Sequence, residues 1–480
     1  MTQHTESADF LARVAGLRVQ LTGPAFLPGE DGYAEETSTY NLITPLRPRV
    51  VVAAASVADV QAAIRFAAEN HLGVAVRGGG HIVAKQDQDI IVVNMRQMRT
   101  VYVDPAKRLV RFEGGALWQE VLDAVTLYRL APLNGSTPTV GATGYVLAGG
   151  HSPILGRSFG WAAEYVTKIE VVTADGRART VTAESDPDLF FALRGTKGNF
   201  GIVTSIEMEV FPITHVYGGG LWFAGEHMAD VLSAWRMWVA AIPTEMATSI
   251  AVQRLPPDPQ LPEPLRGAFV LHLRTAYNGP AEDGEKVLAP MRSAAPVIFD
   301  TVALLSYAQA ATIHRDPPLP FPYVDRSCGL AELTRGTVDA LVRFAGPQSD
   351  CQLASIEIRH LGGALDREPR TPDAIPARGL PFQLFAFGVG PEEQMPALRA
   401  SLAGLVEAIQ PWAYPRRMMA FLSPDEATDP QTVRKLYGPE RYDLLARIKR
   451  QYDPTNMFRV NHNIEPAALA RSDRHLSGAR

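Results

Sequence analysis

Three successive glycines followed by a histidine are the residues of this sequence best suited to chemistry. The apolar run Val74–Val76 leads through Arg77 into Gly78–Gly80 and His81. Because glycine has no Cβ, successive backbone N–H groups can approach a ligand closely, most naturally a diphosphate. The strand-like run Ile90–Asn94 replaces the helix of a dinucleotide fingerprint, and no Gly-Lys-Ser/Thr follows as in a phosphate loop. The residues predict a glycine turn that presents His81, and they leave open a tight turn with a surface histidine.

Three more segments carry the same type of signal. Ser136–Gly144 continues to Gly149-Gly150-His151, and Arg194–Thr204 is another track of small residues. The fourth segment is Tyr452–Ile464, near the C-terminus. Together the four segments resemble the FAD-linked oxidases of the vanillyl-alcohol-oxidase type, in particular the berberine bridge enzyme-like branch. The resemblance covers residues about 30 to 466.

The resemblance implies FAD bonded covalently through His81, a neutral imidazole acting as nucleophile toward the flavin 8α-methyl group. Many members add a second link through a cysteine, and here that place holds Thr137, whose hydroxyl is too weak a nucleophile. We therefore expect a single attachment. By resemblance, the FAD contacts are Val76, Arg77, Gly78, Gly79, Gly80, His81, Ile82, Thr139, Val140, Gly141, Gly144, Tyr145, Ala148, Gly149, Ser152, Gly201, Ile202, Val203, Asn461 and Asn463.

The catalytic base is harder to assign. The family usually supplies a tyrosine where this chain has Met418–Phe421, a stretch without a hydroxyl group, which could also be a core strand. His151 is the preferred candidate, because an imidazole with a pKa near 6.5 accepts protons at neutral pH; a histidine that only packs on the flavin is the alternative. The other candidates are Tyr437, Tyr442 and His360.

His360 belongs to a predicted strand of the substrate domain. Alternation along Ser355–His360 puts Glu357 and Arg359 on one face and Ile358 and His360 on the other. The pattern does not decide which pair faces the flavin.

Both helices and strands are needed to position these residues, and the expected fold class is α+β. We expect a PCMH-type FAD-binding domain and a substrate domain with an antiparallel sheet backed by helices. The predicted boundaries are 1–213 for the FAD domain, 214–433 for the substrate domain, 434–466 for a segment returning to the FAD domain, and 467–480 for a disordered tail. Residues 1 to about 30 are expected to be a loose leader.

Composition excludes several classes of function. The 480 residues are 46% hydrophobic and 20% charged, as in soluble globular proteins, and the net charge of −5 gives no electrostatic case for nucleic acid or membrane. Two cysteines, Cys328 and Cys351, cannot make a disulfide framework and are expected to be buried thiols. The histidine spacing supports no metal site. With no secretory signal visible, we expect a cytoplasmic protein, monomer or homodimer.

The leading hypothesis is a flavin oxidase that removes two electrons from a small molecule and passes them to O2. We expect the small molecule to be a natural product of secondary metabolism. The alternative is a flavoprotein of the same fold with a non-redox cyclisation or drug-binding resistance role, which the missing tyrosine motivates.

Overall fold

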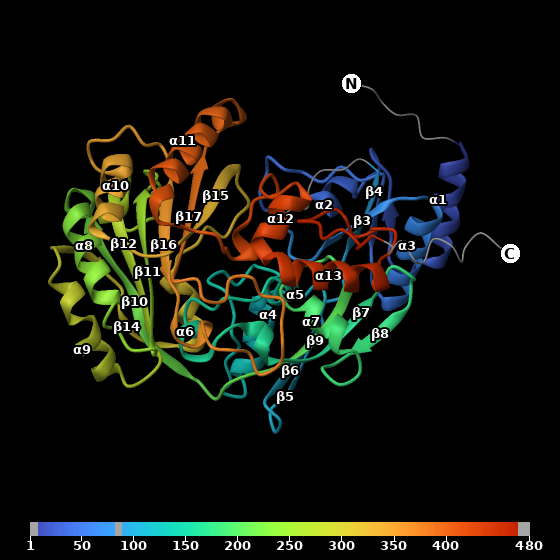
Figure 1. Cartoon of the computed structure of the whole chain (residues 1–480), viewed down its shortest axis with the longest axis horizontal. Helices are drawn as coiled ribbons and strands as arrows, with labels where there is room; N and C mark the ends of the chain where they lie inside the picture. The colour runs from blue at the N-terminus through green and yellow to red at the C-terminus, as the bar shows by residue number, and fades with distance from the viewer. Residues whose placement is uncertain (1–7, 82–88, 469–480) are drawn as a thin grey trace.

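The computed structural model describes residues 8–81 and 89–468, which fold into two lobes that lie side by side (Figure 1). The first lobe contains two sheets built from residues before 210, together with the C-terminal helices. The second lobe contains one large sheet. This mixed α+β architecture is the predicted class.

The first sheet delivers the glycine turn. Its strand order is β1-β2-β4-β3, with β2, β4 and β3 parallel and β1 antiparallel to β2. All three parallel strands are built from apolar, mostly β-branched residues, as expected for strands buried on both faces. The elements are α1 (Ala8–Gln20), β1 (Ala25–Phe26), α2 (Tyr33–Thr37), β2 (Val50–Ala53), α3 (Val57–Glu69), β3 (Gly73–Arg77) and β4 (Ile90–Asn94).

Apolar residues at helical spacing after Ser56 predict a helix that ends at Gly73; helix α3 begins at the predicted place but ends earlier. The Ser56 hydroxyl accepts a hydrogen bond from the backbone N–H of Asp59, which is the expected N-cap. The predicted C-terminal glycine, Gly73, is instead the first residue of β3, and His71 takes the left-handed conformation with φ of 55°. The prediction was wrong because histidine is a several-fold enriched non-glycine residue at positive φ.

The expected loose leader is also wrong within the described residues. α1 covers Ala8–Gln20, and it buries Phe10, Val14 and Leu17 in the same apolar core as α3. The helix was not predicted because only these three residues make up its apolar face, so its amphipathic pattern is weak in the sequence.

The second sheet is antiparallel, in the order β5-β6-β9-β7-β8. The runs 168–175 and 178–181 on either side of Gly176 predict a hairpin, and the antiparallel pair β7–β8 confirms it; Gly176 has φ of 72°. Helices of this part pack with the sheet in one core that includes Phe112, Trp118 and Ile206. The elements are β5 (Val101–Asp104), β6 (Leu109–Glu113), α4 (Trp118–Thr126), α5 (Ala142–Leu147), α6 (Gly156–Phe159), β7 (Val166–Val172), β8 (Ala178–Val181), α7 (Pro187–Leu193) and β9 (Ile202–Glu209).

The second lobe is a nine-stranded antiparallel sheet in the order β13-β10-β12-β11-β16-β17-β15-β18, with β14 also paired to β10. The domain boundary proposed after residue 213 falls between β9 and β10. The strands are β10 (His215–Ala224), β11 (Met246–Arg254), β12 (Phe269–Tyr277), β13 (Val297–Asp300), β14 (Ala303–Ser306), β15 (Tyr323–Leu330), β16 (Ser355–His360), β17 (Phe382–Val389) and β18 (Ala413–Tyr414).

The two faces of this sheet differ in chemistry. One face is apolar and packs with helices into a core that includes Ile250, Leu273 and Ile358. The other face carries polar and charged residues and is turned toward the first lobe (Figure 1). The covering helices are α8 (Met228–Val239), α9 (Ala281–Arg292), α10 (Arg335–Ala345) and α11 (Met395–Ala408).

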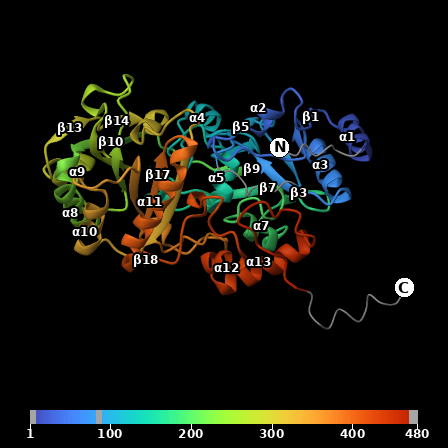
Figure 2. The same ribbon diagram turned by 90° about the horizontal axis from the view of Figure 1, so that it is seen from above.

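The C-terminal helices α12 (Pro430–Tyr437) and α13 (Pro439–Tyr452) lie on the first lobe beside α7, as seen from above (Figure 2). Lys449 is fully buried: its Nζ donates to the Phe458 carbonyl at 3.0 Å and lies 2.8 Å from Asp453 Oδ2. The chain thus leaves the first lobe, builds the second lobe and returns. Of the predicted tail, residues 469–480 lie outside the described residues.

Candidate active site

His81 stands at the end of β3, in a turn made possible by glycine. Gly80 has φ of 71°, a conformation that side chains with a Cβ rarely adopt. The imidazole stacks on the ring of Tyr40, with 4.1 Å between ring centroids and 25° between planes. The backbone N–H of Tyr40 donates to the Gly80 carbonyl at 2.9 Å, so turn and ring are held by the same residue.

The electrostatics of His81 favour the neutral imidazole. Burial lowers its pKa to about 4, although the negative charge of Asp316 acts in the opposite direction. At pH 7 the ring therefore keeps a free nitrogen lone pair, which a nucleophile requires.

Thr137 stands where the resembled family carries its second linking residue, and it contacts the other lobe. Its Oγ1 donates to Asp316 Oδ2 at 2.6 Å. The two cysteines, Cys328 and Cys351, are free and buried on the helix side of the large sheet, as predicted for structural thiols. Among the described residues, neither cysteine therefore supplies a thiol beside His81.

The two predicted glycine segments meet directly. A Cβ on Gly79 would lie 2.5 Å from the backbone nitrogen of Gly141, and a Cβ on Gly141 would lie 2.6 Å from that of Gly79. Only glycine permits this approach, because neither backbone can move away from the other without loss of the turn. At Gly144, by contrast, a Cβ would meet nothing within 4 Å, so this segment borders open space.

The residues present fit FAD. Among the described residues, several buried polar atoms here have no hydrogen-bond partner, including Arg77 Nε and Nη1 and the side-chain oxygens of Asn461 and Asn463. Buried polar groups are normally hydrogen-bonded, so a cradle with several unpaired ones is suited to a polar ligand. Ile82, also predicted to contact the cofactor, lies outside the described residues.

The remaining predicted cofactor contacts lie on three segments of the first lobe. These are the end of β3 with the turn after it, α5 with its flanking loops, and the start of β9. Gly149 has φ of 106° and Gly201 of 155°. These residues are Val76, Gly78, Thr139, Val140, Tyr145, Ala148, Ser152, Ile202 and Val203.

His151 lies between the lobes. Its residue is 7% exposed, its Nδ1 has no hydrogen-bond partner among the described residues, and it lines a cavity with Ser152, Arg274 and Arg359. Burial lowers its pKa to about 3, and the positive charge of Arg359 acts in the same direction. The imidazole is therefore neutral at pH 7 and can accept a proton, but it is a weaker base than an exposed histidine.

Across the cavity stands a buried ion cluster on β16, the strand whose orientation the sequence left open. Arg359 lines the cavity and pairs with Glu357, whereas Ile358 packs into the helix-side core; His360, the last residue of the strand, also borders the cavity. Arg274 Nη1 lies 2.7 Å from Glu357 Oε1, and Arg359 Nη2 lies 3.0 Å from Glu357 Oε2. His314 Nε2 is 3.9 Å from Glu357 Oε1.

The other proposed catalytic residues differ in position. His360 also lines the cavity, with its Nε2 3.3 Å from Arg157 Nη1. The Tyr437 hydroxyl donates to the Gly195 carbonyl at 3.2 Å, and the Tyr442 hydroxyl accepts from the backbone N–H of Glu465 at 3.3 Å. Both tyrosines are in the C-terminal helices, and the structure does not bring them to this cavity.

The alternative that Met418–Phe421 forms a core strand is wrong. It includes a short 3₁₀ turn, Met419–Phe421, with Met418 and Met419 buried. Phe421 contacts the ion cluster, because the Arg359 guanidinium lies 4.8 Å from its ring centroid. The segment thus borders the site without offering a hydroxyl group.

Sequence reasoning missed Arg274, His314 and Asp316. The alternation in Leu271-His272-Leu273-Arg274, with apolar residues on one face and His272 and Arg274 on the other, was the available signal. For His314 and Asp316, which lie outside regular strands, the sequence offers none.

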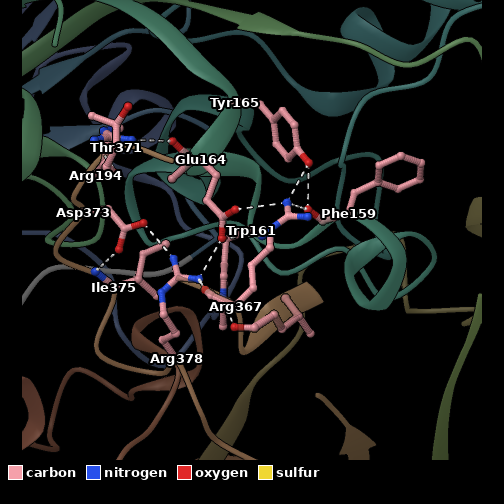
Figure 3. Close-up of polar contacts among 12 residues, drawn as sticks. Phe159, Trp161, Glu164, Tyr165, Arg194, Arg367, Thr371, Asp373, Ile375 and Arg378 are labelled. Carbon is pink, nitrogen blue, oxygen red and sulfur yellow. Dashed lines mark hydrogen bonds and ion pairs between the residues drawn. The ribbon is translucent and has the colours of Figure 1, made fainter. Parts of the chain in front are cut away.

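A connection between β16 and β17, residues 361–380 and here called the strap, joins the second lobe to the first (Figure 3). Arg378 Nη1 lies 2.9 Å from Glu164 Oε1, and its Nη2 lies 2.8 Å from Asp373 Oδ2. Trp161 Nε1 donates to the Leu365 carbonyl at 2.9 Å. Since Trp161 also pairs through its backbone with His151, the strap fixes the segment that carries the candidate base.

Two segments of the chain match known protein families. Residues 48–182 match the family described as FAD binding domain, and residues 419–465 match the one described as berberine and berberine like. The chain is 26% identical over 464 residues to (R)-6-hydroxynicotine oxidase of Paenarthrobacter nicotinovorans, covering 93% of this chain and 98% of that protein. It is 25% identical over 470 residues to xylooligosaccharide oxidase of Thermothelomyces thermophilus, covering 90% of each.

Solved structures show the same fold. A crystal structure of 6-hydroxy-D-nicotine oxidase from Arthrobacter nicotinovorans matches with a TM-score of 0.79 at 22% identity, over 93% of this chain and 98% of that one. The berberine bridge enzyme-like protein 1 of Physcomitrella patens matches with a TM-score of 0.81 at 18% identity, over 95% of this chain and 100% of that one.

The fold and the matched domains define an enzyme of the PCMH-type FAD-linked oxidoreductases. Residues 419–465 carry the match to the berberine and berberine-like family, and the overall fold is shared with the berberine bridge enzyme-like structure. Within the described residues, the structure contains no helix both long and apolar enough to cross a bilayer.

Proposed function

We propose that this enzyme is an oxidase that removes two electrons from a small molecule, with FAD attached through the single residue His81 and O2 as the electron acceptor. The observation that carries the proposal is the neutral His81 imidazole, held against Tyr40 beside the touching glycines 79 and 141. The relatives named above support oxidase chemistry, because their printed names describe oxidases of a nicotine derivative and of a xylooligosaccharide.

When bound, FAD supplies a two-electron acceptor that takes a hydride from the substrate carbon. The chain's own residues do the rest. The glycine turn and Arg77 hold the diphosphate end, and the polar face of the large sheet closes the substrate side. His151 accepts the proton from the adjacent O–H or N–H at its unpartnered Nδ1.

A non-redox role stays the second candidate, because Met418–Phe421 offers no hydroxyl where the family usually has a tyrosine. Anaerobic incubation with panels of amines, sugars, aromatic alcohols and phenols separates the two. An oxidase loses its yellow flavin absorbance with a true substrate, regains it on admission of air and releases peroxide. A panel compound that is converted while the flavin stays oxidised under anaerobic conditions would establish the non-redox role instead.

A further inference from the structure

We infer that the substrate is an aromatic compound bearing an anionic group, a carboxylate or an ionised phenol. Arg359 and Arg274 bind the anion, and five aromatic residues of the second lobe contact the ring. The inference rests on the proposed function, because the flavin lobe forms the opposite wall of the same cavity.

The arginines form a built site. The side chains of Arg274 and Arg359 are 5% and 8% exposed, and Glu357 is the one carboxylate that both contact. Each oxygen of Glu357 is already paired with one guanidinium. Among the described residues, Arg359 Nε has no hydrogen-bond partner, and Arg359 lines the cavity. A guanidinium presents its N–H groups in a fork that matches a carboxylate, so the spare donors suit an anionic oxygen.

Charge around the cavity agrees with this reading. His151 and His314 are neutral at pH 7, because burial lowers both pKa values to about 3. The second carboxylate, Asp316, accepts a hydrogen bond from Thr137 on the His81 side. Asp325, at the other end of the face, has a pKa raised to about 7 by burial, with Lys197 as a neighbouring cation. The Arg274–Glu357–Arg359 cluster has two guanidinium groups and one carboxylate. Asp316 is the next carboxylate: burial acts to raise its pKa, but His314 and Arg274 lower it overall. Arg157, which also lines the cavity, adds a further cation.

The aromatic residues lie on the same face of the sheet. Phe385 pairs across strands with Glu357, and Phe387 pairs with Asp325, which puts their side chains on the cavity side. We call the set Phe321, Tyr323, Phe385, Phe387 and Phe421 the aromatic wall.

The aromatic wall is continuous with the arginines. Phe385 and Phe421 have ring centroids 5.0 Å apart, and Arg359 lies over Phe421. All five rings are partly exposed, although Phe421 also packs against the first-lobe core. Partly exposed rings that meet a cation on one sheet face favour a flat ligand with an acidic end. A neutral polyol fits less well, since both oxygens of the one carboxylate in the cluster are occupied.

The test uses the flavin-loaded enzyme and three ligands: benzoate, its neutral counterpart benzamide, and the non-aromatic cyclohexanecarboxylate. Binding is followed by calorimetry and by the shift of the flavin spectrum. We expect benzoate to bind roughly ten- to a hundredfold more tightly than benzamide, the worth of a hydrogen bond to a charged group. It should also bind at least severalfold more tightly than cyclohexanecarboxylate. Equal binding of benzoate and benzamide would overturn the inference, without need of any variant.

Variants then locate the anion. Arg359→Met should abolish the preference for benzoate over benzamide, whereas Arg359→Lys should keep part of it. Arg326→Met is the control, because Arg326 is on β15, which β17 separates from the Arg359 strand β16, and it pairs with Asp425 at 2.9 Å. Phe421→Leu should reduce the preference for benzoate over cyclohexanecarboxylate. An unchanged benzoate preference in a folded, yellow Arg359→Met protein would contradict the assignment.

Flavin content is measured first, which separates this inference from the proposed function. A flavin-containing protein that binds benzoate no more tightly than benzamide contradicts this inference but not the proposed function. A protein that binds no FAD under any condition contradicts both.

Discussion

At the scale of single residues, His151 is the candidate base whose environment is now defined. Its imidazole is 7% exposed, with Arg359 among the charges that lower its pKa. We expect His151→Phe to keep fold and flavin, because the volumes are similar. Anaerobic flavin reduction by a compound that bleaches the wild-type enzyme should slow by about 10²- to 10⁴-fold, the usual worth of a positioned base.

The pH dependence differs from that of an exposed histidine. A protonated imidazole cannot accept a proton, so activity should be lost as pH falls through the pKa of about 3. The step expected from an ordinary histidine near pH 6.5 should be absent. Stopped-flow reduction from pH 5 to 8 checks this. Reduction in the mutant within a few-fold of wild type would place the base elsewhere, with His360 the next candidate.

The sequence could predict those site residues whose proposed role depends on their own type and spacing. His81 and the touching glycines could be found because a backbone turn needs glycine whatever surrounds it. Arg274 and Asp316 could not, since Arg274 meets Glu357 83 residues further along the chain and Asp316 meets Thr137 179 residues before it.

At the scale of elements, Asp59 ties α3 to the segment before β1. Its carboxylate accepts hydrogen bonds from the backbone N–H groups of Thr22, Gly23 and Ala55, at 2.8, 3.0 and 2.9 Å. Burial alone raises its pKa, but these bonds prevail and lower it overall. We expect Asp59→Asn to lower the free energy of unfolding by about 1–3 kcal/mol at pH 7.

The effect of pH on this variant has a defined sign. A carboxyl group with a lowered pKa stabilises the fold above its unfolded pKa of about 3.9, and this contribution is lost as pH falls through the folded value. Urea unfolding at pH 7 and near pH 3 should therefore show a smaller difference between variant and wild type at the acidic pH. The same difference at both values would argue against an ionised Asp59.

Elements with strong periodicity were predicted well and those with weak periodicity were not. The strands around β4 and β16 and the helix α3 were found from apolar patterns. The strand β11 was missed because Ala247, Thr248 and Ser249 give little hydrophobic contrast, and only its pairing with β12 and β16 makes it a strand. The helix α1 was hidden by a narrow apolar face.

At the scale of the whole molecule, the returning C-terminal segment is fastened by Lys449 and Asp453. Both side chains are 0% exposed, and Asp453 also accepts from the backbone N–H of Met457 at 2.7 Å. Lys449→Met leaves a buried carboxylate without its cation, which typically costs about 3–5 kcal/mol. Lys435→Met, at an exposed position of α12, is the control.

Thermal unfolding followed by flavin fluorescence measures the result. We expect Lys449→Met to lower the midpoint, seen as a rise in the fluorescence of the attached flavin at lower temperature, with Lys435→Met unchanged. Equal midpoints for both variants would mean that the segment is not held by this ion pair.

The central claim is that one histidine carries the flavin, and peptide mapping by mass spectrometry tests it most directly. After acid precipitation and digestion, the account predicts one flavin on the peptide that contains His81 and none on the peptide that contains Thr137. His81→Ala should release all its flavin on denaturation. Flavin found on the Thr137 or Cys328 peptide, or retained covalently in His81→Ala, would contradict the account.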